Sequence, residues 1–263
     1  MQKINKSNCK EVLDFIQSEA VYNVYILGDL HHYGFENDFL SLYVTSGTSN
    51  RPRGVLMHYR DNFVYYANSG VSPSEKLLSY LSINFKNHSC ISGKSSCIAE
   101  LNRFLKFSNE RVTILMLATL QDKSDLIFPH PLQLGIGEIK ELTRFFTKIP
   151  EFRHKYAEVN LTMERLEQNF KENRVFAIKD GYEINATVTL TAETKSDAVI
   201  TDVATLPQLR GTGLARRLLS AVLDLLSFEG KSRIILYVDS INATMLYSSV
   251  GFRQIGNYST LRK

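Results

Sequence analysis

Long hydrophobic runs, abundant cysteine and a strong excess of one charge are all missing from this 263-residue sequence. No apolar run approaches ~18 residues, so the sequence predicts no transmembrane helix. The N-terminal residues lack the apolar block of a signal peptide, and we expect a cytoplasmic protein with no membrane partner. The net charge of +4 includes no basic tract or basic-aromatic stripe, which makes nucleic acid a poor candidate for a partner.

Cysteine is sparse, because the chain has only Cys9, Cys90 and Cys97. A small odd number without a signal peptide indicates reduced thiols. The spacing of Cys90 and Cys97 matches no zinc pattern, and we expect no metal cofactor. A nucleophilic cysteine is one interpretation, but a free cysteine more often behaves as a small buried hydrophobic residue, and we adopt that interpretation.

Proline and glycine gather between Gln121 and Gly137, a density that breaks regular structure. This segment predicts a linker between two domains, 1–125 and 138–263, each of ordinary domain size. The pattern of the second domain predicts the order α-α-β-β-β-α-β-α-β. The first domain gives nearly the same order, so we predict two structurally related halves.

Apolar periodicity and capping signals give the limits of the expected elements. Helices are expected at 7–16, 22–30, 72–85, 96–107, 138–149, 163–173, 214–228 and 241–249. Strands are expected at 39–44, 53–59, 63–67, 89–92, 111–118, 174–179, 184–193, 198–205, 233–238 and from 252 onward. Ser7 and Thr162 are predicted N-caps, Ser72–Glu75 a predicted capping box, and Asp180-Gly181 a predicted hairpin turn.

The most informative segment is the loop Arg210–Ala215, which reads Arg-Gly-Thr-Gly-Leu-Ala. It follows the apolar run 198–205 and opens the expected helix 214–228. Small residues at the start of a helix leave backbone N–H groups uncovered, and the first turn carries a partial positive charge. The pattern therefore predicts a phosphate or pyrophosphate site. A glycine-rich turn without a ligand is the alternative.

The residues around the two glycines exclude the commonest nucleotide loops. A Walker A loop needs Gly-Lys-Ser/Thr, whereas Gly213 is followed by Leu214. A dinucleotide fingerprint needs a third glycine where the chain has Arg216. Arg216 and Arg217 each oppose the helix dipole by ~0.3–1 kcal/mol, and a bound polyphosphate would reverse that sign. Two solvated arginines are the alternative.

A second motif lies at the C-terminal side of this loop. Asn242 stands at the start of an expected helix, Leu246 and Tyr247 follow inside it, and Gly251 and Phe252 lead into the last strand. An asparagine, a Leu-Tyr pair and a Gly-Phe pair therefore occur in this order on a helix-to-strand segment.

Together, the two motifs resemble those of the GCN5-related N-acetyltransferase (GNAT) superfamily. That family has an Arg/Gln-x-x-Gly-x-Gly/Ala pyrophosphate loop, which Arg210, Gly213 and Ala215 match, and an Asn…Leu-Tyr-x-x-x-Gly-Phe signature, which the second motif matches. The resemblance covers about 139–263. Residues Ile149–Phe152, together with Val203–Pro207, further resemble a two-domain branch of the superfamily.

The resemblance implies an α/β (α+β) fold of two tandem GNAT-like domains. Each is expected to be a mixed, mostly antiparallel twisted sheet flanked by helices. The equivalent turn of the N-terminal half, Asn68–Pro73, contains no pyrophosphate motif. We therefore expect a degenerate N-terminal domain and one cofactor site per chain.

The activity implied is transfer of an acetyl group from acetyl-CoA to a primary amine by direct attack on the thioester. Backbone groups of the loop would bind the pyrophosphate, backbone near an expected strand bulge would stabilise the oxyanion, and Asn242 would bond the pantetheine arm. The implied cofactor-binding residues are Val203, Ala204, Thr205, Arg210, Gly211, Thr212, Gly213, Leu214, Ala215, Arg216 and Asn242.

Tyr247 is the implied proton donor to the departing thiolate, and a packed tyrosine is the alternative. Asp197 is the implied catalytic base because it lies near the position of a catalytic glutamate in some family members. Glu193 and Asp202 are further candidates, and for all three the alternative is a solvated or salt-bridged carboxylate.

The acceptor is expected to be a small-molecule or peptide amine, and the protein a monomer or homodimer. His31, His32 and His154 could line a cleft, although surface positions are the simpler interpretation. A non-catalytic acyl-CoA-binding sensor is the alternative function, since the same loop would bind the cofactor in either case.

Overall fold

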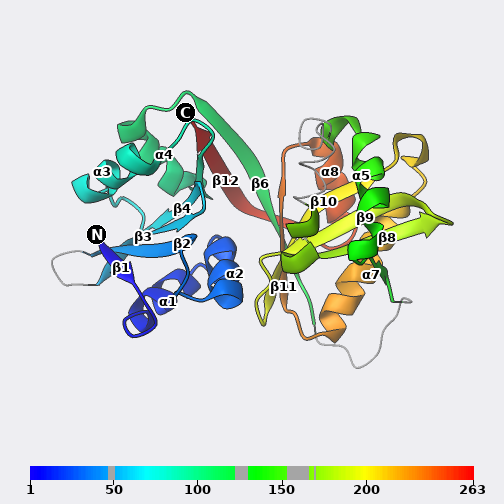
Figure 1. Ribbon diagram of the computed structural model, residues 1–263, viewed down its shortest axis with the longest axis horizontal. Coiled ribbons are helices and arrows are strands. Elements are labelled where there is room, and N and C mark those ends of the chain that lie inside the picture. Colours follow the sequence, from blue (N-terminus) through cyan, green and yellow to red (C-terminus); the bar gives the residue numbers. More distant parts are fainter. Residues whose placement is uncertain (47–50, 122–129, 153–165, 169) are drawn as a thin grey trace. The chain divides into compact units, whose positions relative to one another are not determined.

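The computed structural model describes residues 1–46, 51–121, 130–152, 166–168 and 170–263 (Figure 1). These residues form two compact units that interleave along the chain. Unit 1 comprises Met1–Leu115, Tyr237–Asp239 and Gln254–Lys263, and unit 2 comprises Met116–Leu236 and Ser240–Arg253. The domain limits 1–125 and 138–263 stay a prediction about which parts of the chain fold independently.

Unit 1 is built on a mixed sheet in the strand order β1-β2-β3-β4-β5-β12. The strands are β1 (Gln2–Ile4), β2 (Leu40–Ser46), β3 (Pro52–Tyr59), β4 (Asn62–Ala67), β5 (Cys90–Lys94) and β12 (Arg253–Arg262). All neighbouring pairs are antiparallel except β4 and β5, which are parallel. The C-terminal strand thus completes the N-terminal sheet, with Tyr258 opposite Lys94 and Arg262 opposite Cys90.

Four helices belong to unit 1: α1 (Lys10–Gln17), α2 (Val24–Tyr33), α3 (Glu75–Asn84) and α4 (Ser95–Leu105). Helix α3 connects the parallel strands β4 and β5, as a parallel pair requires a crossover. The core between helices and sheet includes Ile16, Ile26, Phe63, Leu77 and Ile98, all fully buried. Strand β6 (Asn109–Thr119) then leads from unit 1 into unit 2.

Two capping predictions in unit 1 are wrong by a few residues. Helix α1 begins at Lys10 without a side-chain cap, because the Ser7 hydroxyl instead donates to Asn5 Oδ1 over 2.7 Å. Helix α3 begins at Glu75, where Ser74 Oγ accepts from the backbone N–H of Leu77 over 3.3 Å. The serine two residues later than predicted is therefore the cap, since only its hydroxyl reaches the third helical N–H.

Unit 2 has a sheet in the order β11-β10-β9-β8-β7. The strands are β7 (Leu132–Gln133), β8 (Arg174–Asp180), β9 (Glu183–Thr191), β10 (Asp197–Thr205) and β11 (Arg233–Val238). Pairing is antiparallel from β7 to β10 and parallel between β10 and β11. Both units thus have the predicted mixed, mostly antiparallel sheet with flanking helices, and the tight turn between Asp180 and Glu183 is the predicted hairpin.

The described helices of unit 2 include α5 (Ile139–Thr147), α7 (Leu214–Phe228) and α8 (Ile241–Ser248), with short 3-10 turns at Ile136–Glu138, Pro150–Phe152 and Pro207–Leu209. One core cluster joins Phe145 and Phe146 of α5 to Val175, Ile184 and Ala204 of the sheet. Helix α7 packs against β8, β9 and β10. Helices α5 and α7 thus cover apolar residues of the strands that lead to the candidate loop.

The predicted helix 163–173 is only partly covered by the structure. Residues 166–168 and 170–172 are helical, whereas its predicted cap, Thr162, lies outside the described residues. Within the described parts of the chain, no helix is both long and apolar enough to cross a membrane.

Candidate functional site

Two glycines in left-handed conformations shape the loop between β10 and α7. Gly211 has φ +80° and Gly213 has φ +83°, a region that side chains other than glycine adopt at a cost. A Cβ atom at either position would meet no described heavy atom within 4 Å. Glycine is therefore required here by the backbone conformation and not by crowding, and the space beside the loop is open.

The N-terminus of α7 has an uncapped first turn. Its N-cap residue is Gly213, which has no side chain to accept a hydrogen bond from the helix, and no acidic residue lies in the first turn. Arg216 and Arg217 are exposed there, and Leu214 and Ala215 are partly exposed. Unpaired N–H groups, the positive end of the helix dipole and two guanidinium groups together suit an anion.

The backbone favours a different frame for the glycine motif than the one that starts at Arg210. Counted from Gln208, the two glycine positions of Arg/Gln-x-x-Gly-x-Gly/Ala fall on Gly211 and Gly213, both with positive φ. Counted from Arg210, the last position falls on Ala215, inside α7, where no special residue is needed. Gln208 is exposed and was not among the predicted site residues, although the Gly-x-Gly spacing itself indicates it.

Arg210 is held by a carboxylate from another part of unit 2. Its two terminal nitrogens donate to the two carboxylate oxygens of Glu151 over 2.9 and 2.8 Å. The pair lowers the pKa of Glu151 and raises that of Arg210, because each group stabilises the charge of the other. Both side chains are about half exposed. Arg210 thus carries a bidentate acidic partner at the place where the sequence predicts a phosphate.

Strand β10 contains the expected bulge. Its register against β9 shifts between Thr201, opposite Thr189, and Ala204, opposite Thr187, so that β10 has one extra residue. Asp202 has φ +46°, and the Thr187 hydroxyl donates to its carbonyl oxygen over 3.1 Å. The bulge turns part of the backbone around Val203 out of the regular ladder.

On its other side, β10 pairs with β11 over a short distance. The parallel pairs that the structure describes run from Asp197–Arg233 to Val199–Ile235, whereas β10 continues to Thr205. The backbone of the second half of β10 is therefore not part of this ladder. Extended backbone of this kind can pair with an extended ligand, because each residue presents one donor and one acceptor.

The second motif forms α8 and its C-terminal turn. Ser240 is the N-cap, accepting from the N–H of Ala243, so Asn242 lies exposed in the first turn and does not cap the helix. Tyr247 is partly buried with its ring 5.9 Å from that of Phe252, and the N–H of Phe252 donates to its carbonyl oxygen. Gly251, with φ +100°, permits this tight turn.

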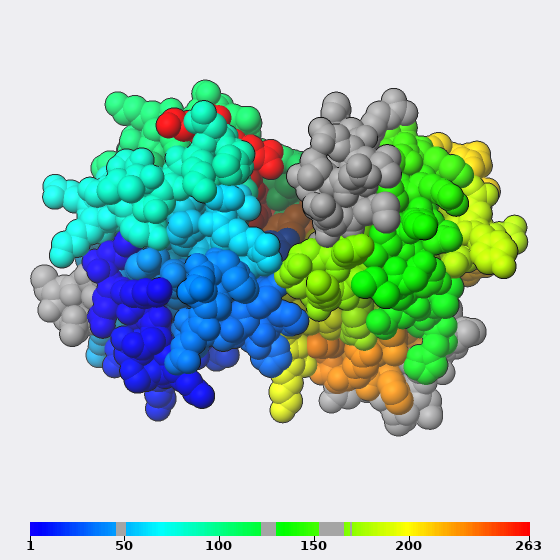
Figure 2. All heavy atoms as spheres, in the orientation of Figure 1, coloured from blue at the N-terminus to red at the C-terminus, as the bar shows by residue number. Residues whose placement is uncertain are grey.

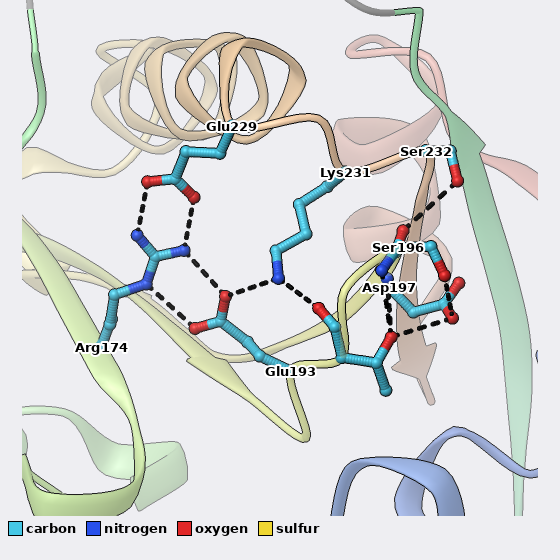
Figure 3. A network of polar contacts seen from close by, with 8 residues as sticks. Arg174, Glu193, Ser196, Asp197, Glu229, Lys231 and Ser232 are labelled. Carbon is cyan, nitrogen blue, oxygen red and sulfur yellow. Dashed lines mark hydrogen bonds and ion pairs between the residues drawn. The ribbon is translucent and has the colours of Figure 1, made fainter. Parts of the chain in front are cut away.

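Asp197 is buried in an ion pair with Arg233, and Figure 3 shows the contact of its carboxylate with Ser196. Arg233 donates to both of its carboxylate oxygens, with 2.9 Å from Nη2 to Oδ2, and the hydroxyls of Thr194 and Ser196 donate to Oδ2. The pair raises the pKa of Arg233. Asp197 begins β10, roughly 25 Å of strand from Thr205 at about 3.3 Å per residue. Its catalytic role stays a prediction, and its contacts are those of a salt-bridged carboxylate.

Glu193 belongs to the same network and is also paired. Arg174 makes bidentate contacts with Glu193 and with Glu229 over 2.7–2.9 Å, and Lys231 contacts both Glu193 and the carbonyl oxygen of Thr194 (Figure 3). These ion pairs join β8, the β9–β10 connection and the end of α7. They stabilise the end of the sheet at which β10 starts. The glycine loop follows the opposite end of β10.

The other reactive residues are placed as the simpler interpretations expect. Cys97 is buried and Cys90 partly buried, and burial raises the pKa of both thiols, which disfavours the nucleophilic thiolate. His31 and His32 are exposed, and His154 lies outside the described residues. Among the described residues, no group of three or more His, Cys, Asp or Glu side chains could hold a metal ion.

Comparisons with known proteins agree with the fold. Residues 139–252 match the acetyltransferase (GNAT) family. A Drosophila melanogaster protein is 12% identical with a TM-score of 0.66 and covers 99% of this chain and 97% of its own. A GCN5-related N-acetyltransferase from Sphaerobacter thermophilus is 16% identical with a TM-score of 0.61 and covers 100% and 94%. No curated protein matches the sequence.

A tandem GNAT protein from the clavulanic acid biosynthesis pathway has the same architecture, with 12% identity, a TM-score of 0.56 and coverage of 99% of this chain and 97% of its own. Residues 139–252 therefore match the GNAT family, and the chain as a whole has the fold of these two-domain proteins. The family match supports acetyltransferase activity in general, and acetyl-CoA is the acyl donor that the family normally uses.

Proposed function

We propose that the chain transfers an acetyl group from acetyl-CoA to a primary amine by direct attack of the amine on the thioester. The observation that carries the proposal is the pair of left-handed glycines, Gly211 and Gly213, directly before the uncapped N-terminus of α7. This arrangement lies at the end of a bulged strand whose pairing with β11 stops early. The structure describes this set of features entirely within unit 2.

The residues present fit the phosphates of coenzyme A. Backbone N–H groups of the first α7 turn have no side-chain cap, and the space at both glycines is open to a phosphate. Arg216 adds a positive charge beside them. The predicted loop residues would bind the phosphates through their backbone N–H groups. These residues are Arg210, Gly211, Thr212, Gly213, Leu214 and Ala215.

When bound, acetyl-CoA would supply an acetyl group activated as a thioester. Backbone N–H groups from Val203 to Thr205, at the bulge, would stabilise negative charge developing on the thioester oxygen. Backbone of the second half of β10, on the side away from β9, would hold the pantetheine arm from one side. The exposed amide of Asn242 in α8 would bond the arm from another helix.

Tyr247 would give a proton to the departing thiolate. Phenols ionise near pH 10 in water, so a tyrosine is a proton donor at neutral pH. The amine must lose a proton before attack, and Asp197 is the base that the family resemblance suggests. Arg233 holds the Asp197 carboxylate, so D197N also lowers stability. A direct role as base requires that kcat of D197N falls under conditions where the variant is still fully folded.

The test measures release of free CoA thiol with a panel of primary amines. We expect Y247F to lower kcat by about 100-fold, the range of general-acid catalysis, with the Kd of acetyl-CoA unchanged. Y182F, which removes the hydroxyl of an exposed tyrosine of unit 2, serves as the matched control. Unchanged turnover in Y247F would remove Tyr247 as the acid. Tight CoA binding without thiol release for any amine would favour the sensor function.

A further inference from the structure

A cavity of unit 2 lies between α5 and the β8–β9 hairpin, and its walls include no residue of the glycine loop. Its volume is about 230 Å³, and its walls include Glu141, Arg144 and Phe145 of α5 and Tyr182 and Ile184 of the hairpin. Helix α5 lies at the surface of this unit in the space-filling view, where it is green (Figure 2). Nothing in the proposed acetyl transfer uses these side chains.

Glu141 lines this cavity and has one carboxylate oxygen that accepts no hydrogen bond from a described residue. Its Oε2 atom is buried, and no described residue donates a hydrogen bond to it. A buried acceptor without a donor is costly, and the cost is greater for a charged group. A positive group that enters the cavity beside the Glu141 carboxylate would offset part of this cost by stabilising its negative charge. The carboxylate therefore favours a ligand that carries a positive nitrogen.

The remaining charges of the cavity leave one cation available. Lys148 and Glu183 pair with each other over 2.6 Å and so neutralise one another. Arg144 is exposed and makes no ion pair with any residue in the described part of the chain. It lies three positions after Glu141 on α5, on the same helix face, at about 5–6 Å between Cβ atoms. One carboxylate and one guanidinium thus stand side by side and unpaired.

The third property of the cavity is its apolar wall. Phe145 and Ile184 are buried, with 2% of each exposed, and give the wall a fixed shape. Tyr182 is 89% exposed at the tip of the hairpin, directly after Gly181 with φ +55°. An aromatic ring held at a turn and left open to solvent offers contact area at low entropic cost.

We propose that this cavity binds a free α-amino acid in its zwitterionic form. The α-ammonium group pairs with the Glu141 carboxylate, the α-carboxylate accepts from the Arg144 guanidinium, and an apolar or aromatic side chain lies against Phe145 and Tyr182. The two charges of a zwitterion sit on one carbon, which suits two side chains of opposite charge one helical turn apart. A volume of about 230 Å³ suits such a small ligand, since sites for larger ones begin at roughly 300 Å³.

The experiment is an NMR titration of the whole chain with L-phenylalanine, in the absence of acetyl-CoA. It follows the backbone amides of Arg144, Tyr182 and Ile184. Two ligand analogues separate the charges: 2-phenylethylamine lacks the carboxylate, and N-acetyl-L-phenylalanine lacks the ammonium group. The variants E141Q and R144Q remove each protein charge in turn, and K140Q changes an exposed charge on the same helix as the matched control.

We expect saturable shifts with L-phenylalanine, at least tenfold weaker binding of both analogues and in both charge variants, and unchanged binding in K140Q. Absence of saturable shifts at these amides would overturn the proposal, as would equal binding of either analogue or full affinity in E141Q. Because acetyl-CoA is absent, a failure here leaves the proposed acetyl transfer untouched. A failure of that transfer equally leaves this binding in place.

Discussion

Replacement of Gly213 by alanine tests the loop most directly. Gly213 has φ +83° at the N-terminus of α7, and an added Cβ would meet no described atom within 4 Å. The perturbation is therefore purely conformational. A left-handed residue with a Cβ atom costs about 1–2 kcal/mol, because the Cβ approaches the following carbonyl oxygen.

This cost must appear either in stability or in ligand binding. If the loop keeps its conformation, the free energy of unfolding falls by about 1–2 kcal/mol and CoA still binds. If the loop relaxes, its N–H groups leave the phosphate and CoA affinity falls by up to about 30-fold, since 1.4 kcal/mol is a factor of ten. Asparagine tolerates left-handed φ better than alanine, so G213N should lie between wild type and G213A.

Gly230 provides the matched control at the other end of the same helix. It has φ +78° and equally open surroundings. The 15-residue helix α7 separates the two glycines by about 22 Å at 1.5 Å per residue. G230A should therefore lower stability as much as G213A and leave CoA binding unchanged.

Calorimetric titration with CoA and urea unfolding of the two variants measure both quantities. Wild-type affinity together with wild-type stability in G213A would refute the assigned backbone strain. Equal loss of CoA affinity in G213A and G230A would refute the assignment of the ligand to this end of α7. Weaker CoA binding or lower stability in G213N than in G213A would contradict the conformational explanation.

Three further predictions follow from the ion pairs and from burial. E151Q should raise CoA affinity up to about fivefold at low salt, because an exposed ion pair worth ~0.2–1 kcal/mol no longer holds Arg210. Weaker CoA binding than in the wild type, titrated at the same salt concentration, would contradict this. D197N should lower the free energy of unfolding by about 1–3 kcal/mol in urea, since Arg233 loses its charged partner; a change below about 0.5 kcal/mol would be contrary. Burial lowers the pKa of His58 in the folded state, so the unfolded state takes up the proton first as the pH falls. The contribution of His58 to the free energy of unfolding should therefore be complete above about pH 6.5 and decline below it, and H58Q should lack this decline.

Elements with strong apolar periodicity were predicted well. The limits of α7, 214–228, and of β11, 233–238, agree with the structure residue for residue. Both bury long runs of aliphatic side chains, and their ends carry glycine or charge. The short strands β1 and β7 were missed, because three and two residues cannot show alternation and pairing with β2 and β8 defines them.

The caps show where local sequence is ambiguous. Ser72 and Ser74 flank the same proline, and only the backbone path decides which hydroxyl reaches a helical N–H. Asn242 follows Ser240 in a similar way, and the serine caps the helix. When two candidate capping residues lie two positions apart, the sequence does not decide between them, because the backbone φ and ψ angles determine which one caps the helix.

The glycine loop of the candidate site was predictable from its motif and spacing, and the bulge from the family resemblance, but the ion pairs were not. Glu151 lies 59 positions before Arg210, and Arg233 lies 36 positions after Asp197. Such pairs depend on which strands and turns become neighbours in three dimensions. For the same reason, the cavity beside Glu141 has no signature in the sequence.

The pairing of β12 with β5 gives this chain a definite order of assembly during synthesis. Strand β5 ends at Lys94, whereas its partner begins at Arg253, after nearly all of unit 2 has been made. At roughly 5–20 residues per second, the first sheet waits on the order of ten seconds for its last strand. During that time the edge of β5 is open on the ribosome, and we expect a chaperone or a temporary partner strand to cover it in the cell.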